Sequence, residues 1–113
     1  MRKIKIGDRE YEIHYGQNAI CALEDELQEP ITETLKRINK GKAKLADFRA
    51  IIWAGMLKGR RDFTPEIVGE LIESAEQRVV DMGTECMPEL VSSFRRYIVN
   101  DSGEEKEEPE KND

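Results

Sequence analysis

Residues 45–73 have the sequence LADFRAIIWAGMLKGRRDFTPEIVGELIE, and this stretch decides the fold of the 113-residue chain. Its first half repeats apolar residues at helical spacing and is almost continuously apolar over 51–57. A helix that is apolar on most sides is typical of the centre of a domain, where several neighbours cover it. Thr64 and Pro65 then indicate a helix start, because a hydroxyl N-cap followed by proline suits the first turn. We therefore predict a central helix followed by a second, amphipathic one.

Both helices have a predicted inward face. In the central helix it comprises Leu45, Phe48, Ile51, Ile52 and Met56, and in the second helix it comprises Ile67, Val68, Leu71 and Ile72, with Glu66, Glu70 and Glu73 outward. Gly55 costs the central helix about 1 kcal/mol of helix propensity relative to alanine. A glycine at such a position favours the close approach of another element, so we expect a second helix to pack against Gly55.

The N-terminal residues alternate between apolar and polar side chains. Ile4 and Ile6 share one face and, after a Gly7-Asp8 break, Tyr11 and Ile13 share another. Alternation with a period of two around a Gly-Asp turn is typical of a β-hairpin. Because a two-stranded sheet is marginal alone, the hairpin should pack on the helices.

Helical patterns fill the rest of the chain to residue 98. We predict a first helix capped by Asn18 and ended by Pro30, and a second over 32–40 ended by Gly41. The basic residues Lys36, Arg37, Lys40, Lys42 and Lys44 suit a helix end and a solvated loop. In the last helical region, over 75–98, Gly83 and Pro88 predict a break or kink between them.

Charge is concentrated at the C-terminal end. Residues 101–113 contain seven acids and two lysines, so five of the six net negative charges lie there and the body is nearly neutral. This end has no aliphatic or aromatic residue, a composition typical of disorder. The predicted fold is mainly α: one domain over 1–99, with an N-terminal β-hairpin packed on a bundle of about four to five short helices, and a disordered acidic tail over 100–113.

The composition offers little for catalysis. There is a single histidine, His14, and the two cysteines, Cys21 and Cys86, are far apart and form no metal-binding spacing. No nucleophile motif or phosphate-binding loop is present. We expect no enzyme, no cofactor and no metal, and buried, reduced thiols in a cytoplasmic protein. The charged start lacks a following apolar run, and no window approaches about 18 apolar residues, so we expect neither a signal peptide nor a membrane partner.

Nucleic-acid binding is a weaker alternative. A DNA-binding helix-turn-helix uses a turn of about three to four residues, whereas the span between the two central helices, 58–63, is longer. The helix that would enter the groove carries Glu66, Glu70 and Glu73, whose carboxylates would face phosphates. We therefore expect no nucleic-acid partner, and a small DNA-binding regulator is kept only as the second alternative function.

Three sequence blocks carry a family resemblance. They are the N-terminal hairpin leading into residues 22–24 (ALE), residues 51–56 (IIWAGM) and residues 63–72 (FTPEIVGELI). In their order and spacing, over about residues 4–80, the chain resembles the small phage tail assembly chaperones of siphophage-like tail operons and gene transfer agents. Members are also described as tail tube or minor tail components. Pro88 and the acidic end depart from the family pattern.

The resemblance implies a chaperone in the bacterial host cytoplasm. Its partner would be the tape measure protein, which is long, helical and apolar and aggregates when bare, and tail tube subunits would be a second partner. A small helical protein with an apolar groove can cover such surfaces until the tail assembles. The first alternative is a structural minor tail or tail tube-associated component that stays in the virion.

Four residues are the candidates for partner contact: Trp53, Leu90, Phe94 and Tyr97. Leu90, Phe94 and Tyr97 belong to the large apolar face of the last segment, over 89–99. An apolar face of this kind usually packs in the core. We therefore expect only part of it to contact a partner, at the place where Trp53 and this segment meet. Whether Trp53 is buried in its own fold, and whether the chain oligomerises, stay open.

Overall fold

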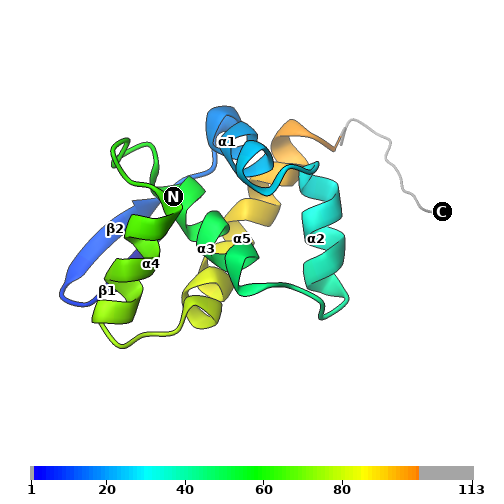
Figure 1. The fold of residues 1–113 in the computed structure, drawn as a ribbon. Coiled ribbons are helices and arrows are strands. Elements are labelled where there is room, and N and C mark those ends of the chain that lie inside the picture. Colours follow the sequence, from blue (N-terminus) through cyan, green and yellow to red (C-terminus); the bar gives the residue numbers. More distant parts are fainter. Residues whose placement is uncertain (1, 100–113) are drawn as a thin grey trace.

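The computed structural model describes residues 2–99, which form a β-hairpin followed by five helices (Figure 1). The elements are β1 (Arg2–Ile6), β2 (Arg9–Ile13), α1 (Gln17–Leu27), α2 (Ile31–Asn39), α3 (Leu45–Met56), α4 (Pro65–Ser74) and α5 (Val79–Tyr97). The predicted mainly helical fold with an N-terminal hairpin is confirmed. The predicted acidic, disordered tail lies outside the described residues.

The hairpin is an antiparallel pair in which Ile4 lies opposite Tyr11. Its turn has Gly7 in the left-handed region, with φ of 63°, which glycine adopts without strain. Alternate side chains of both strands, including Ile4 and Ile13, are buried, and the intervening ones face solvent. β1 packs against α5 and β2 against α3, so the helices supply the support that a two-stranded sheet needs.

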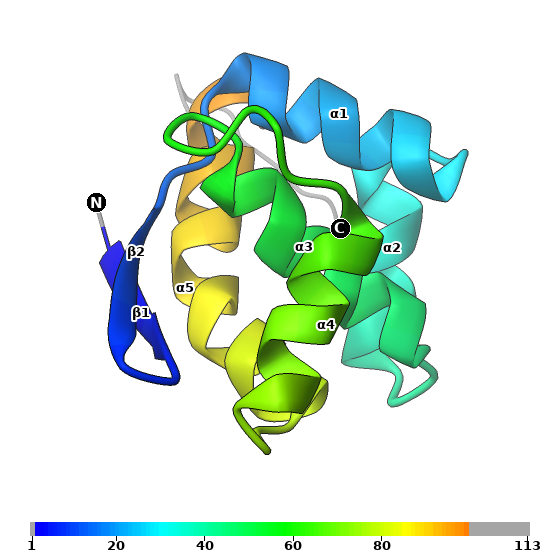
Figure 2. The same ribbon diagram turned by 60° about the vertical axis from the view of Figure 1, so that its left-hand side comes forward.

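Helix α3 is the centre of the fold. It contacts α1, α4, α5 and β2, and Figure 2 shows it between α4 and α5 with α1 across one end. Its buried residues are Asp47, Ala50, Ile51, Ile52, Ala54, Gly55 and Met56. This confirms the central position predicted from the apolar run.

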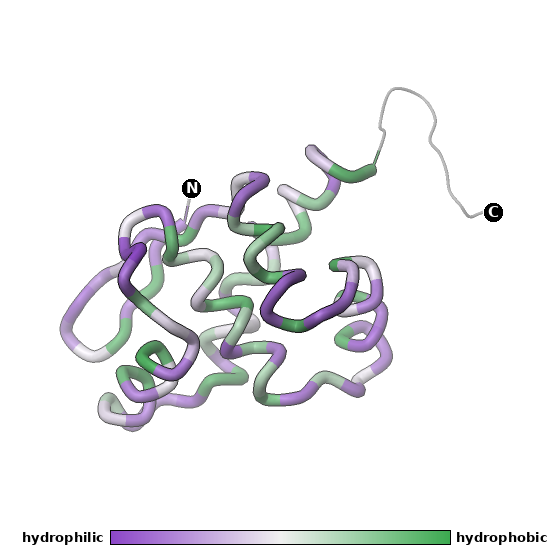
Figure 3. The backbone as a smooth tube through the Cα atoms, turned by 45° about the horizontal axis from the view of Figure 1, so that its top comes forward, coloured by the Kyte–Doolittle hydropathy of each residue, from purple (hydrophilic) through white to green (hydrophobic). Residues whose placement is uncertain are grey.

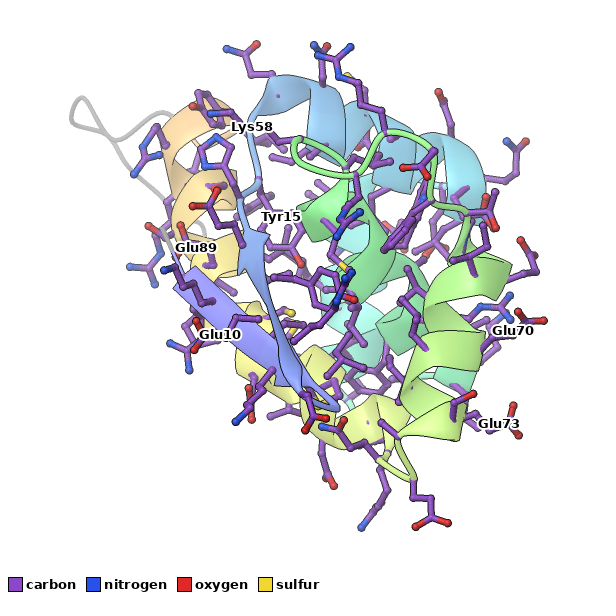
Figure 4. The ribbon with its side chains drawn as sticks, turned by 90° about the vertical axis from the view of Figure 1, so that its left-hand side faces the viewer. Glu10, Tyr15, Lys58, Glu70, Glu73 and Glu89 are labelled. Carbon is purple, nitrogen blue, oxygen red and sulfur yellow. The ribbon has the colours of Figure 1, made fainter. Side chains whose placement is uncertain are left out.

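The close approach at Gly55 involves the hairpin rather than a helix. A Cβ atom on Gly55 would lie 2.9 Å from Cγ2 of Ile13 and 2.9 Å from the hydroxyl oxygen of Tyr15. Tyr15 points inward from the segment after β2 (Figure 4), and its hydroxyl donates a hydrogen bond of 2.6 Å to the Ile51 carbonyl. The expectation of a helix at Gly55 is therefore wrong, because the bulky Tyr15 ring occupies that space.

The close helix contact occurs at Gly83, inside α5. A Cβ atom there would lie 2.6 Å from Cδ1 of Phe48, so glycine is needed for α5 to reach α3. Of the predicted break or kink between Gly83 and Pro88, the break is wrong, since α5 runs unbroken from Val79 to Tyr97. Pro88 and Thr84, whose carbonyl loses its amide partner, are both exposed, so the missing hydrogen bond falls on the solvent side.

The predicted helix ends agree with the structure at α4 and α2 but not at α1. The Thr64 hydroxyl accepts a hydrogen bond of 3.1 Å from the Ile67 amide, which confirms the predicted cap of α4. Gly41 has a left-handed φ of 75° after α2, as predicted. The start of α1 differs: Gly16, rather than Asn18, is the N-cap, and no side chain caps this end.

Replacing Gly83 by alanine should lower the free energy of unfolding by about 1–3 kcal/mol, because the added methyl group overlaps Phe48. The matched control is Gly69→Ala, in another helix. Its methyl group would meet only the flexible Arg49 side chain, at 3.2 Å, and should be neutral or stabilise by up to about 1 kcal/mol. Urea unfolding followed by far-UV circular dichroism measures both, and equal effects of the two changes would contradict the close α3–α5 contact.

Candidate partner-binding surface

Three helices border an open groove of about 740 Å³, formed where the start of α3, the length of α4 and the start of α5 meet. Its lining residues are Leu45, Ala46, Arg49, Glu66, Gly69, Glu70, Ile72, Glu73, Gln77, Arg78, Val79 and Val80. We call this feature the α3–α4–α5 groove. Helices frame it on three sides, so an elongated partner could lie along α4.

Part of the lining of the groove is apolar. Leu45, in the first turn of α3, is 65% exposed, more than any other large apolar side chain that the structure describes. Ala46 lies beside it, and Val79 and Val80 contribute half-buried side chains from α5. Burying such surface against a partner is favourable in proportion to the area removed from water.

Two exposed residues depart from their predicted inward position. Leu45 and Ile67, the latter 38% exposed, belong to the faces expected to pack in the core. Both lie in the first turn of their helices. The groove was not predicted from the sequence. The sequence feature that could have indicated the groove is the apolar residues in the first turns of helices, because neighbouring elements cover such positions least reliably.

Acidic side chains line the α4 side of the groove. Glu66, Glu70 and Glu73 are exposed at spacings of four and three residues, which places them on one stripe of the helix. Figure 4 shows Glu70 and Glu73 pointing away from the body of the protein. Arg49 crosses toward this stripe, with its Nη2 3.8 Å from Oε2 of Glu66, and Gly69 leaves room for its side chain.

The four predicted contact residues do not form one surface. Trp53 is half-buried, and its indole N–H donates a hydrogen bond of 2.9 Å to the Phe63 carbonyl, just before α4. Phe48, five residues earlier, faces α5 at Gly83, and five residues correspond to about 140° around a helix. Trp53 therefore points away from the α5 side of α3. Leu90 is 0% exposed and belongs to the core, so it offers no surface to a partner.

The end of α5 carries the remaining two predicted residues. Phe94 is half-buried against the core, and Tyr97 is 39% exposed. Ile98 follows at 44% exposure, and Figure 3 shows this apolar end of the helix. Arg95 and Arg96 flank it, so this patch has the opposite charge to the acidic side of the groove.

The sequence of this helical scaffold matches a family described as phage tail tube protein, GTA-gp10, over residues 2–77. The chain belongs to this family. Searches of curated proteins and of solved structures found no match. The matched segment holds the hairpin and α1–α4 of the GTA-gp10 family protein and ends just before α5. Membership confirms the phage-tail part of the resemblance, and two sides of the groove lie within the matched segment.

Beyond the groove, the matched segment of the GTA-gp10 family protein contains a part-buried charge cluster. The Arg37 guanidinium donates to Glu29 and to the fully buried Asp47, each at 2.8 Å. The Lys44 amide also donates to Asp47, at 2.8 Å. The interpretation of Arg37 as a solvated helix-end charge is therefore wrong, because it joins α2 to α3. The cluster is internally paired and holds the fold rather than a ligand.

The pKa values in this cluster are displaced in the direction that ion pairing requires. Hydrogen bonds from Arg37 and from the Thr34 hydroxyl lower the pKa of Glu29 from 4.5 to about 2. Burial alone would raise the pKa of Asp47, but hydrogen bonds from Arg37 and the Lys44 amide outweigh it and lower that pKa. Both carboxylates therefore stabilise the fold when the pH is above their ordinary pKa values. This stabilisation is lost as the pH falls through their pKa values in the folded protein.

The other titratable candidates provide no site. Cys86 is buried, and burial raises the pKa of its thiol to about 12. Cys21 is exposed on α1, so the expectation that both thiols are buried is wrong for Cys21. Within residues 2–99, no group of three or more His, Cys, Asp or Glu side chains could hold a metal ion. No helix in the same range has the length and apolar character needed to span a membrane.

Arg37→Met should lower the free energy of unfolding of the GTA-gp10 family protein by roughly 3 kcal/mol at neutral pH, because the buried Asp47 loses its cation. The wild-type protein should lose stability as the pH falls from 4.5 toward 2, and the variant should lose less over this range. Trp53 fluorescence during urea unfolding at several pH values measures both effects. Arg95→Met, at an exposed position, is the control, and a similar loss in both variants would contradict the account.

Proposed function

We propose that this GTA-gp10 family protein is a non-enzymatic tail assembly chaperone that binds the tape measure protein and keeps it soluble until the tail assembles. Tail tube subunits are a second partner in this proposal. Membership of a phage tail family supports a role in the tail. That the role in the tail is that of a chaperone is our proposal.

One observation carries the chaperone assignment: a groove with exposed apolar lining residues on a small helical protein. Leu45 is 65% exposed there, next to the half-buried Val79 and Val80. Amphipathic helices bind such grooves through their apolar face, and the tape measure protein is expected to be helical and apolar. The polar sides of the groove limit the apolar area that a partner can bury, which favours binding that is reversible at assembly.

The proposal places this binding in the host cytoplasm and without nucleic acid. Glu66, Glu70 and Glu73 are exposed on α4. A DNA-binding regulator with a helix-turn-helix would place this helix against the phosphates. Repulsion between these carboxylates and the DNA phosphates would weaken binding to DNA. The acidic face of α4 therefore argues against a small DNA-binding regulator that uses this helix.

Co-expression with the tape measure protein of the same operon tests the proposal. The soluble fraction of the tape measure protein should rise several-fold, and the two proteins should co-purify through a tag on this chain. The control is the same plasmid with a stop codon early in the chaperone gene. If the tape measure protein is equally soluble with and without the chain, the chaperone function is wrong.

A structural tail component is the second candidate, and the description of the matched family as a tail tube protein favours it. Mass spectrometry of purified particles separates the two. A chaperone should be absent from particles or present far below the amount of the tape measure protein. A fixed stoichiometric amount in every preparation would instead establish the structural role.

A further inference from the structure

The acidic stripe of α4 is incompletely neutralised by the protein itself. Glu66 lies 3.8 Å from Arg49, but Glu70 and Glu73 have no ion-pair or hydrogen-bond partner in the part of the chain that the structure describes. The other cation of the groove, Arg78, lies 3.7 Å from Asp81 on its own helix. Two carboxylates beside apolar lining residues are thus available to a partner.

We propose that the α3–α4–α5 groove selects a cationic amphipathic helix, whose apolar stripe covers Leu45 and Val80 while its Lys or Arg side chains pair with Glu70 and Glu73. This rests on the proposed function, because it specifies which kind of tape measure segment is bound. It adds to the proposed function the sign of the partner's charge and the face of this protein that recognises that charge.

The spacing of the acids favours a helix over other cations. Glu66 and Glu73 are seven residues apart, which is about 10 Å along the helix axis. A helix lying along α4 repeats its own basic residues at the same interval, so several pairs form together. A metal ion fits less well, because Glu70 and Glu73 point outward rather than converging (Figure 4).

The other exposed apolar patch has the opposite charge pattern. Tyr97 and Ile98, at the end of α5, lie beside Arg95 and Arg96, which repel a cationic helix. Charge therefore distinguishes the two surfaces where apolar exposure alone does not. A cationic helix is directed to the groove, since like-charge contacts weaken binding at the end of α5.

Two synthetic peptides test the selectivity. Both are fluorescein-labelled helices of about 20 residues with the same leucine stripe, one with lysines flanking the stripe and one with glutamates. Fluorescence anisotropy with the full chain should show about tenfold tighter binding of the lysine peptide, a preference that weakens as salt is added. The Glu70→Lys/Glu73→Lys variant should reverse the preference and bind the glutamate peptide more tightly.

The matched control is Asp25→Lys/Glu26→Lys, which changes the net charge by the same amount on the exposed face of α1. It should keep the preference for the lysine peptide. Leu45→Ser should weaken both peptides, and its exposed position keeps the fold intact, which circular dichroism checks. Equal binding of the two peptides to the wild-type chain, or the same loss in the control as in the groove variant, would overturn the proposal.

The outcome is separable from that of the proposed function. If the wild-type chain solubilises the tape measure protein and the Glu70→Lys/Glu73→Lys variant does so equally well, the charge selection is wrong and the chaperone function stands. If the peptides bind as expected but the tape measure protein gains no solubility, the groove chemistry stands and the chaperone function is wrong.

Discussion

The requirement to cover α3 on nearly every side determines the rest of the structure. Its apolar residues leave few directions in which the helix can face water, so α1, α4, α5 and the hairpin all pack on it. Close approach is possible only where side chains are missing. Gly55 admits the end of the hairpin and Gly83 admits Phe48, so these glycines set how tightly the layers close. The core of α3 is consequently scaffold, and the candidate partner surface lies at its N-terminal end, along α4 and at the start of α5.

Helix α2 depends on a different interaction. Its main helical neighbour is α1, and the ion pair between Arg37 and the fully buried Asp47 links it to the central helix. Leu35 and Ile38 of α2 also pack against the core. Glu29, in the middle of the α1–α2 connection, binds the same guanidinium. Because the cation and both carboxylates satisfy one another, three separate segments are fixed by one part-buried cluster. The cluster fixes the relative positions of these segments and contributes no binding site.

Local signals predicted much of the fold but little of the candidate site. The alternation around Gly7 predicted the hairpin, and Thr64 with Pro65 predicted the start of α4, because both depend on neighbouring residues alone. Pro88 was misread because its cost depends on which side of the helix it faces. The groove and the buried role of Arg37 could not be predicted, since each needs segments that are far apart in the sequence to be placed in space. Among the predicted contact residues, Leu90 is in the core, and Trp53 lies apart from the end of α5.

The proposed binding of a partner in the groove brings these features together, with α3 as support, apolar lining residues for binding and the acids of α4 for selection. Hydrogen exchange followed by mass spectrometry, on the chain alone and in its complex with co-expressed tape measure protein, tests this account most directly. The account predicts slower exchange across α4 and in the first turns of α3 and α5, with the last turn of α5 unchanged. Protection confined to the end of α5, or no difference between the two states, would contradict it.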